Sequence, residues 1–220
     1  MELFFDLDGT LTNPESGITQ CIAHALTSLG RPSPPTDLLR CYIGPPLREA
    51  FAELLGTEDE RTLDAALAYY RERFVAVGMY ENEVYHEVPH GLATLRERGH
   101  RLWVATSKPA VYARPILEHF HLSLLFQGIY GSELSGERAD KGALIAHILE
   151  REHLDPSDVC MIGDRAHDIV GGRANKTRTI AVLWGYGSEE ELLRAKPDCV
   201  AESMAALIGL VDAKPPSTTR

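Results

Sequence analysis

Short apolar segments that end in polar residues or glycine recur along the chain and predict buried strands. Four clear segments and two weaker ones lie at residues 3–7, 102–105, 159–162, 180–183, 129–130 and 199–201. Segments whose apolar residues follow a helical spacing separate most of them. Strands that alternate with helices predict an α/β protein with a parallel sheet covered by helices.

The first and second predicted strands are separated by nearly a hundred residues, whereas a crossover between parallel strands needs about a dozen. Apolar residues at helical spacing fill this interval, on two stretches with Ile18, Ile22, Leu26 and Leu29, and with Leu63, Leu67, Tyr70, Phe74 and Val77. Thr57 and Glu60 match a capping box that predicts a helix start. We expect residues 14–87 to form an inserted α-helical domain, and residues 1–13 and 88–220 to form the α/β core domain.

Composition narrows the class of protein further. The 220 residues carry a net charge of −10, which disfavours binding to nucleic acid or to an anionic membrane. Four cysteines without a C-x-x-C spacing suggest reduced thiols, and neither a signal peptide nor a membrane span is apparent. We therefore expect a cytoplasmic protein, with a frayed tail at residues 214–220.

Four aspartates follow two of the predicted strands. Asp6 and Asp8 come at the end of the first strand, while Asp164 and Asp168 follow the strand at 159–162. Ligands of open α/β sheets bind at the carboxyl ends of the strands, so these four carboxylates should meet in one crevice. A cluster of carboxylates needs a cation, and oxygen ligands open to a phosphate favour Mg²⁺.

Phosphate-binding groups are predicted at the same edge. Thr106 and Ser107 follow the second strand of the core and offer hydroxyl donors, and Lys141 precedes a helix and offers a positive charge. Together these groups suggest phosphoryl transfer to a carboxylate, with Asp6 as nucleophile. Asp8 is placed to act as general acid and then as general base.

The chain resembles the haloacid dehalogenase superfamily, in its branch of phosphoglycolate phosphatases and 5′-nucleotidase-like enzymes. The resemblance rests on four segments in order, namely Asp6-Leu7-Asp8-Gly9-Thr10-Leu11-Thr12, Thr106-Ser107-Lys108-Pro109, Lys141 and Gly163-Asp164-Arg165-Ala166-His167-Asp168. It implies that Asp6 is the nucleophile, Asp8 the acid and base, and Thr106 and Lys141 phosphate ligands.

The resemblance also implies a Rossmann-like core with the first strand central, a metal site and a cap. The Mg²⁺ ligands would be Asp6, Asp164 and Asp8 through its carbonyl, with Asp168 acting through a metal-bound water. Residues 14–87 would form a C1-type helical cap, and its specificity loop would place Arg48 against a carboxylate or second phosphate of the substrate. No histidine has the spacing of a metal ligand, so we assign His167 to the surroundings of the site.

These features predict an Mg²⁺-dependent phosphatase of small phosphate monoesters, either phosphoglycolate-like or nucleoside 5′-monophosphates, that acts through an aspartyl-phosphate. A phosphomutase of the same superfamily remains open, as does a signalling or binding module with a long-lived phosphoaspartate. The expected partner is a small-molecule phosphate ester, and we expect a monomer or a weak homodimer.

Overall fold

The computed structural model describes residues 1–213, so the tail at 214–220 lies outside the described residues. Its main sheet has six parallel strands in the order β5-β4-β1-β6-β7-β8. These strands are β1 (Glu2–Phe5), β4 (Arg101–Pro109), β5 (Gly128–Ser132), β6 (Val159–Gly163), β7 (Arg178–Val182) and β8 (Cys199–Ala201). The first strand is central, and all six predicted strands are confirmed to within a few residues.

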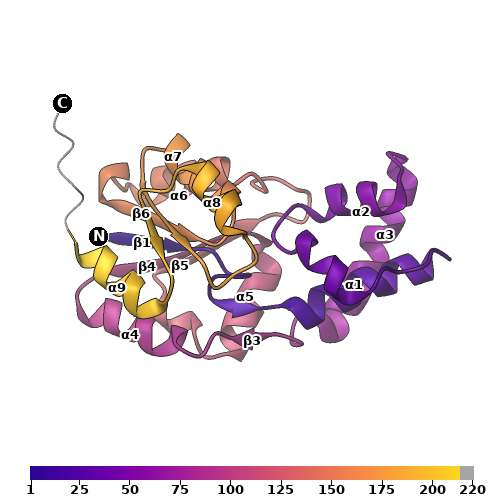
Figure 1. The fold of residues 1–220 in the computed structure, drawn as a ribbon, viewed down its shortest axis with the longest axis horizontal. Helices are drawn as coiled ribbons and strands as arrows, with labels where there is room; N and C mark the ends of the chain where they lie inside the picture. Colours follow the sequence, from indigo (N-terminus) through magenta and orange to yellow (C-terminus); the bar gives the residue numbers. More distant parts are fainter. Residues whose placement is uncertain (214–220) are drawn as a thin grey trace.

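Helices cover both faces of this sheet (Figure 1). They are α4 (Val88–Glu97), α5 (Ala110–His119), α6 (Lys141–Glu152), α7 (Ala166–Ala174), α8 (Glu189–Ala195) and α9 (Met204–Asp212), with short turns η3 (Ser123–Leu125) and η4 (Pro156–Asp158). Alternate residues of β1 serve the two faces: Leu3 and Phe5 pack with α4, α5 and α9, and Phe4 packs with α6. The α/β fold class is confirmed.

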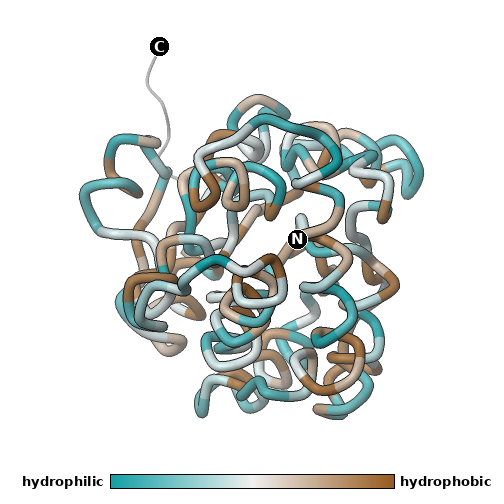
Figure 2. The backbone as a smooth tube through the Cα atoms, turned by 90° about the vertical axis from the view of Figure 1, so that its right-hand side faces the viewer, coloured by the Kyte–Doolittle hydropathy of each residue, from teal (hydrophilic) through white to brown (hydrophobic). Residues whose placement is uncertain are grey.

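A helical region extends from one side of the sheet (Figure 1). It contains α1 (Glu15–Ser28), η1 (Thr36–Tyr42), α2 (Leu47–Leu55), α3 (Glu60–Arg73) and η2 (Phe74–Gly78). Seen from that side, hydrophobic and hydrophilic stretches alternate along its turns, as in amphipathic helices (Figure 2). The short antiparallel strands β2 (Thr12–Asn13) and β3 (Glu83–Val84), which were not predicted, pair where the chain enters and leaves this region.

The predicted division into a cap domain at 14–87 and a core domain at 1–13 and 88–220 stays a prediction. The pairing of β2 with β3 joins its two boundaries. Within residues 1–213, no helix is long and apolar enough to cross a membrane.

Two local predictions in the helical region were wrong. The helix after Thr57 begins with Asp59 as its N-cap, because the Asp59 carboxylate accepts the Thr62 N–H at 2.9 Å, while Thr57 Oγ1 accepts the N–H of Asp59. Val77 does not continue the buried face of α3. The chain widens into a π-helical turn at Phe74–Gly78, which changes the helical phase and leaves Val77 47% exposed.

Candidate active site

The carboxyl ends of neighbouring strands bring the predicted residues together. Asp6 directly follows β1, and its N–H donates to Ile162 O of the adjacent β6 at 3.0 Å. Asp164 follows β6, and Thr106 lies in β4 on the other side of β1. All three side chains are buried. The parallel register therefore places residues separated by about 50 to 160 positions at one sheet edge, as the sequence predicted.

Lys141 is the buried cation of this edge. Its Nζ lies 3.0 Å from Asp6 Oδ1 and 2.7 Å from Asp168 Oδ1, and it donates to Ala105 O at 2.9 Å. Two of these contacts are buried ion pairs, and the third is a hydrogen bond to the backbone. Burial alone would lower the pKa of Lys141, but the carboxylates of Asp168 and Asp6 outweigh it and raise that pKa. Lys141 is therefore held as a charged group.

The same environment shifts the pKa values of the two carboxyls that follow β1 in opposite directions. Burial acts to raise the pKa of Asp6, but the charges of Lys141 and His167 oppose it, and the pKa falls below its usual value. For Asp8 burial prevails over the attraction of Lys108, and the pKa rises. The two pKa values are thus shifted in opposite directions, and Asp8 holds a proton more readily than Asp6 does.

Lys108 is a site residue that the sequence reasoning placed at this edge but gave no role. Its ammonium group pairs with Asp8 Oδ2 and lies 4.9 Å from the ring centre of Phe74, which belongs to the helical region. This contact joins the candidate acid to the far wall of the site. Its position in the Thr106-Ser107-Lys108 segment was the available signal.

The Asp164 side chain is closely surrounded by backbone, and the neighbouring glycines could not be replaced by residues with a Cβ. Its Oδ1 accepts from Thr10 Oγ1 and its Oδ2 from Tyr186 N, both at 2.9 Å. A Cβ on Gly9 or Gly185 would lie 2.1 or 2.3 Å from Asp164 side-chain atoms, so only glycine fits there. Burial, followed by repulsion from Asp168 and Asp6, raises the pKa of Asp164 to about 8.

These residues fit a hard divalent cation. Asp8 Oδ1 is buried and accepts no hydrogen bond from the described residues, and the pKa of Asp164 is raised first by burial and then by the nearby carboxylates of Asp168 and Asp6. The donors are oxygen atoms, which suit Mg²⁺. The predicted metal set of Asp6, Asp8, Asp164 and Asp168 stays a prediction.

His167 lies closer to this centre than its sequence assignment implied. Ligand atoms of Asp6, His167 and Asp168 lie within 4.8 Å of one another, the metal-type grouping found among the described residues. Lys141 already contacts both carboxylates at this place, so an ion held by these three residues would compete with its ammonium group. We therefore favour the oxygen atoms around Asp6 and Asp164 as the cation site.

A cavity of about 340 Å³ opens between the sheet edge and the helical region. Asp6, Asp8, Thr106 and Ser107 line it from the core, whereas Lys141, Asp164 and Asp168 are not among its lining residues. Four aromatic residues also line it, namely Tyr42, Tyr70, Phe74 and Tyr112. Three of these rings pack on one another, because the Phe74 ring stacks on Tyr70 and meets Tyr112 edge-on.

Arg48 lines the cavity, but its guanidinium is engaged by the helical region itself. It pairs with Glu60 at 2.6 Å and with Asp64. Both carboxylates lie on α3, while Arg48 lies on α2. Its predicted role as a ligand of a remote anionic group stays a prediction.

Comparisons with known proteins agree with this fold. The sequence profile of the haloacid dehalogenase-like hydrolases matches residues 3–182. A 5′-nucleotidase of Pseudomonas aeruginosa is 45% identical over 205 residues, covering 93% of this chain and 92% of the relative. The tyrosine-protein kinase PtkA of Mycobacterium tuberculosis is 39% identical over 186 residues, which cover 84% of this chain and 62% of the kinase.

Solved structures show the same architecture. A crystal structure described as a predicted phosphatase from Clostridium acetobutylicum superposes with a TM-score of 0.91 and 38% identity, covering 96% of this chain and 97% of that one. The chain belongs to the haloacid dehalogenase-like hydrolases. The family resemblance drawn from the motifs is confirmed, and the helices between β2 and β3 are its C1-type cap helices.

Proposed function

We propose that this protein is an Mg²⁺-dependent phosphatase that hydrolyses nucleoside 5′-monophosphates through a phosphorylated Asp6. The observation that carries the proposal is a pair of carboxyls that line one cavity, each against its own lysine: Asp6 Oδ1 lies 3.0 Å from Lys141 Nζ, and Asp8 pairs with Lys108. The balance of burial and charge lowers the pKa of Asp6 and raises that of Asp8. Two carboxyls whose pKa values are separated by their surroundings are suited to different roles in one reaction.

Asp6 is the nucleophile because it is ionised, lines the cavity and is held by Lys141. Its carboxylate oxygen forms a bond to phosphorus while the bond from phosphorus to the ester oxygen breaks. Asp8, as a carboxylic acid, gives its proton to the leaving oxygen, and as a carboxylate it then takes a proton from the attacking water. Water displaces phosphate from Asp6 and restores the enzyme.

Thr106 and Ser107 line the cavity beside Asp6 and would donate hydrogen bonds to the phosphate. Asp6, Asp164 and the Asp8 carbonyl would hold Mg²⁺, with Asp168 in support. When bound, that cation supplies positive charge that reduces the repulsion between carboxylate and phosphate. Lys141 does not line the cavity, and it contributes its positive charge through its ion pairs with Asp6 and Asp168.

The cavity supports a nucleoside as the leaving group. Its aromatic lining offers apolar surface to a planar base, which phosphoglycolate does not have. Arg48, the residue predicted to receive a remote carboxylate, pairs instead with Glu60 and Asp64 at an exposed position. The name of the 5′-nucleotidase relative points in the same direction.

The proposal is tested by phosphate release from a panel of nucleoside 5′-monophosphates, phosphoglycolate and sugar phosphates, with Mg²⁺ and with EDTA. We expect metal-dependent release with the highest kcat/KM for a nucleoside monophosphate. Higher kcat/KM for phosphoglycolate would overturn the substrate class. Well-folded protein that releases no phosphate from any ester would overturn the hydrolase.

A further inference from the structure

Arg165 connects the catalytic edge of the core to the cap helices. It belongs to the loop between β6 and α7, one residue after Asp164. Its Nη1 donates to Ile43 O at 2.6 Å, across 122 positions of sequence. The Arg165 side chain is 13% exposed, so this charged hydrogen bond is largely shielded from water.

Contacts within the core domain also fix the orientation of the Arg165 guanidinium. Its Nε donates to Glu191 Oε1 at 2.9 Å, and the same oxygen accepts from Ala166 N at 2.9 Å. Glu191 lies in the first turn of α8, so a second core helix fixes the direction of Arg165. A donor that is already oriented loses less conformational entropy when the acceptor arrives.

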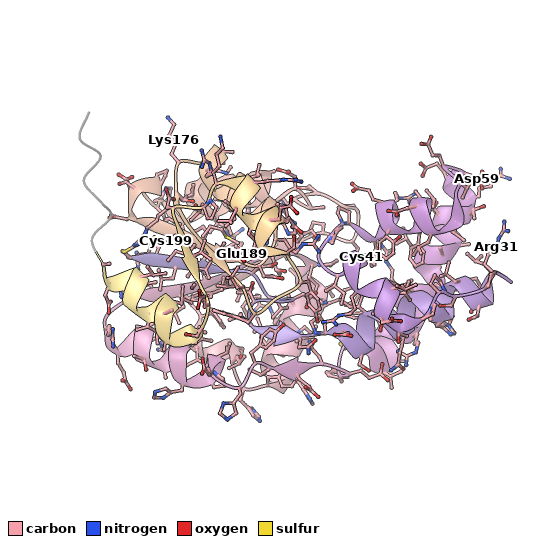
Figure 3. All side chains as sticks on the ribbon, viewed as in Figure 1. Arg31, Cys41, Asp59, Lys176, Glu189 and Cys199 are labelled. Atoms are coloured by element: carbon pink, nitrogen blue, oxygen red, sulfur yellow. The ribbon has the colours of Figure 1, made fainter. Side chains whose placement is uncertain are left out.

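The acceptor loop is shaped to approach Arg165 closely. Gly44 follows Ile43 and has a φ of +104°, which L-residues rarely adopt, and a Cβ there would lie 3.2 Å from Arg165 Cγ. Figure 3 shows nearby Cys41 on the side of the helical region toward the core, with Arg31 and Asp59 at its far end. Residues 42 and 44–48 line the cavity, so this loop is also a wall of the candidate active site.

We propose that Arg165 is a positioning residue that docks the cap loop at residues 42–48 on the core and so closes the cavity around the ester. Arg165 does not itself line the cavity, and it acts through the loop. Its effect on turnover rests on the proposed function, whereas the docking can be measured without any substrate.

The first test measures hydrogen exchange of the amides at residues 40–48 in the substrate-free protein. Arg165→Met keeps the aliphatic stem and removes the donors. We expect exchange of this segment to become about tenfold faster or more, as for loss of a charge-assisted hydrogen bond. Arg165→Lys should fall between wild type and Arg165→Met. Unchanged exchange in Arg165→Met would overturn the proposal.

Arg194→Met is the matched control. Arg194 lies on α8 and pairs with Glu190 on the same helix, so its loss removes an equal charge without touching the cap. Exchange at 40–48 should stay at the wild-type rate, and an equal acceleration there would contradict a specific role for Arg165. If Arg165→Met does not fold, Glu191→Gln tests the same contact, and it should accelerate exchange by a smaller factor.

Turnover separates this role from general damage to the core. We expect Arg165→Met to raise KM for a nucleoside 5′-monophosphate about tenfold, while kcat/KM for methyl phosphate stays within about twofold, because methyl phosphate has no group that reaches the loop. Equal losses for both esters would overturn the positioning role. If no ester is hydrolysed at all, the proposed function fails, and hydrogen exchange still decides the docking.

Discussion

Lys141 Nζ lies 2.7 Å from Asp168 Oδ1, and both side chains are almost completely buried. Lys141 begins α6 and Asp168 lies in the first turn of α7, so this ion pair joins two helices on one face of the sheet. The same ammonium group reaches Asp6 at 3.0 Å. One buried cation thus contributes both to the packing of the core and to the ionised state of the candidate nucleophile.

Replacing Lys141 by Met should destabilise the protein by about 3–5 kcal/mol at pH 7, because two buried carboxylates lose their partner. The pKa of Asp6 is lowered in the folded protein, so the ion pair contributes stability above the usual pKa and loses it as the pH falls. The deficit should therefore shrink as the pH falls below about 4, since the usual pKa is 3.8. Urea unfolding at several pH values measures it, and a loss below about 1 kcal/mol at pH 7 would contradict this description.

Asp164 predicts a pH effect of opposite sign. Its pKa is raised to about 8 from a usual value of 3.8, so in this range the folded protein holds a proton that the unfolded chain releases. In EDTA the stability should fall by up to about 1.4 kcal/mol per pH unit as the pH rises from 5 to 8. Asp164→Asn should remove this part of the slope, and Mg²⁺ should weaken it in wild type. If the stability of wild type and of Asp164→Asn changes with the same slope against pH in EDTA, the raised pKa of Asp164 is contradicted.

The aromatic wall should govern nucleoside binding. Tyr112→Leu removes one ring that meets Phe74 at 5.3 Å and should raise KM for a nucleoside 5′-monophosphate about three- to tenfold, with a small change in kcat. Tyr80→Leu is the control, because Tyr80 is 46% exposed and is not among the cavity-lining residues. Steady-state kinetics of both variants check this. Equal KM values in the two variants would contradict a role of the aromatic wall in nucleoside binding.

Arg48 separates the two substrate classes. Because its guanidinium is engaged in exposed ion pairs with Glu60 and Asp64, Arg48→Ala should change KM for a nucleoside 5′-monophosphate by less than about threefold. A ligand role for a second anion would instead give a selective loss of about tenfold or more with phosphoglycolate. Comparing KM of this variant for the two esters distinguishes Arg48 as a ligand of a second anionic group from Arg48 as a partner of Glu60 and Asp64.

Much of the fold could be predicted because its determinants are local. The β1 and β6 strands are buried on both faces, so their continuous apolar residues stand out, and the parallel register then brings Asp6 and Asp164 together. The inserted helices were readable from apolar spacing. The π-helical turn at Phe74–Gly78 was not, since it depends on how α3 packs rather than on its own sequence.

The contacts that refine the site could not be predicted for a related reason. Lys108 meets Asp8 across 100 positions, and Arg165 meets Ile43 across 122. Both depend on side-chain directions, and the second also depends on where the cap loop lies, which neither spacing nor residue type specifies. Arg48 illustrates the same limit, because its partners lie on another helix.

The central claim is that phosphate passes through Asp6, and rapid acid quenching during turnover of a ³²P-labelled nucleoside 5′-monophosphate tests it most directly. We expect wild type to carry a hydroxylamine-sensitive label that decays into free phosphate, and Asp6→Asn to fold normally, carry no label and turn over about 10⁴-fold more slowly. A label that persists would favour a signalling module, and one that moves to tyrosine would favour a kinase. Fast phosphate release by Asp6→Asn would contradict the account.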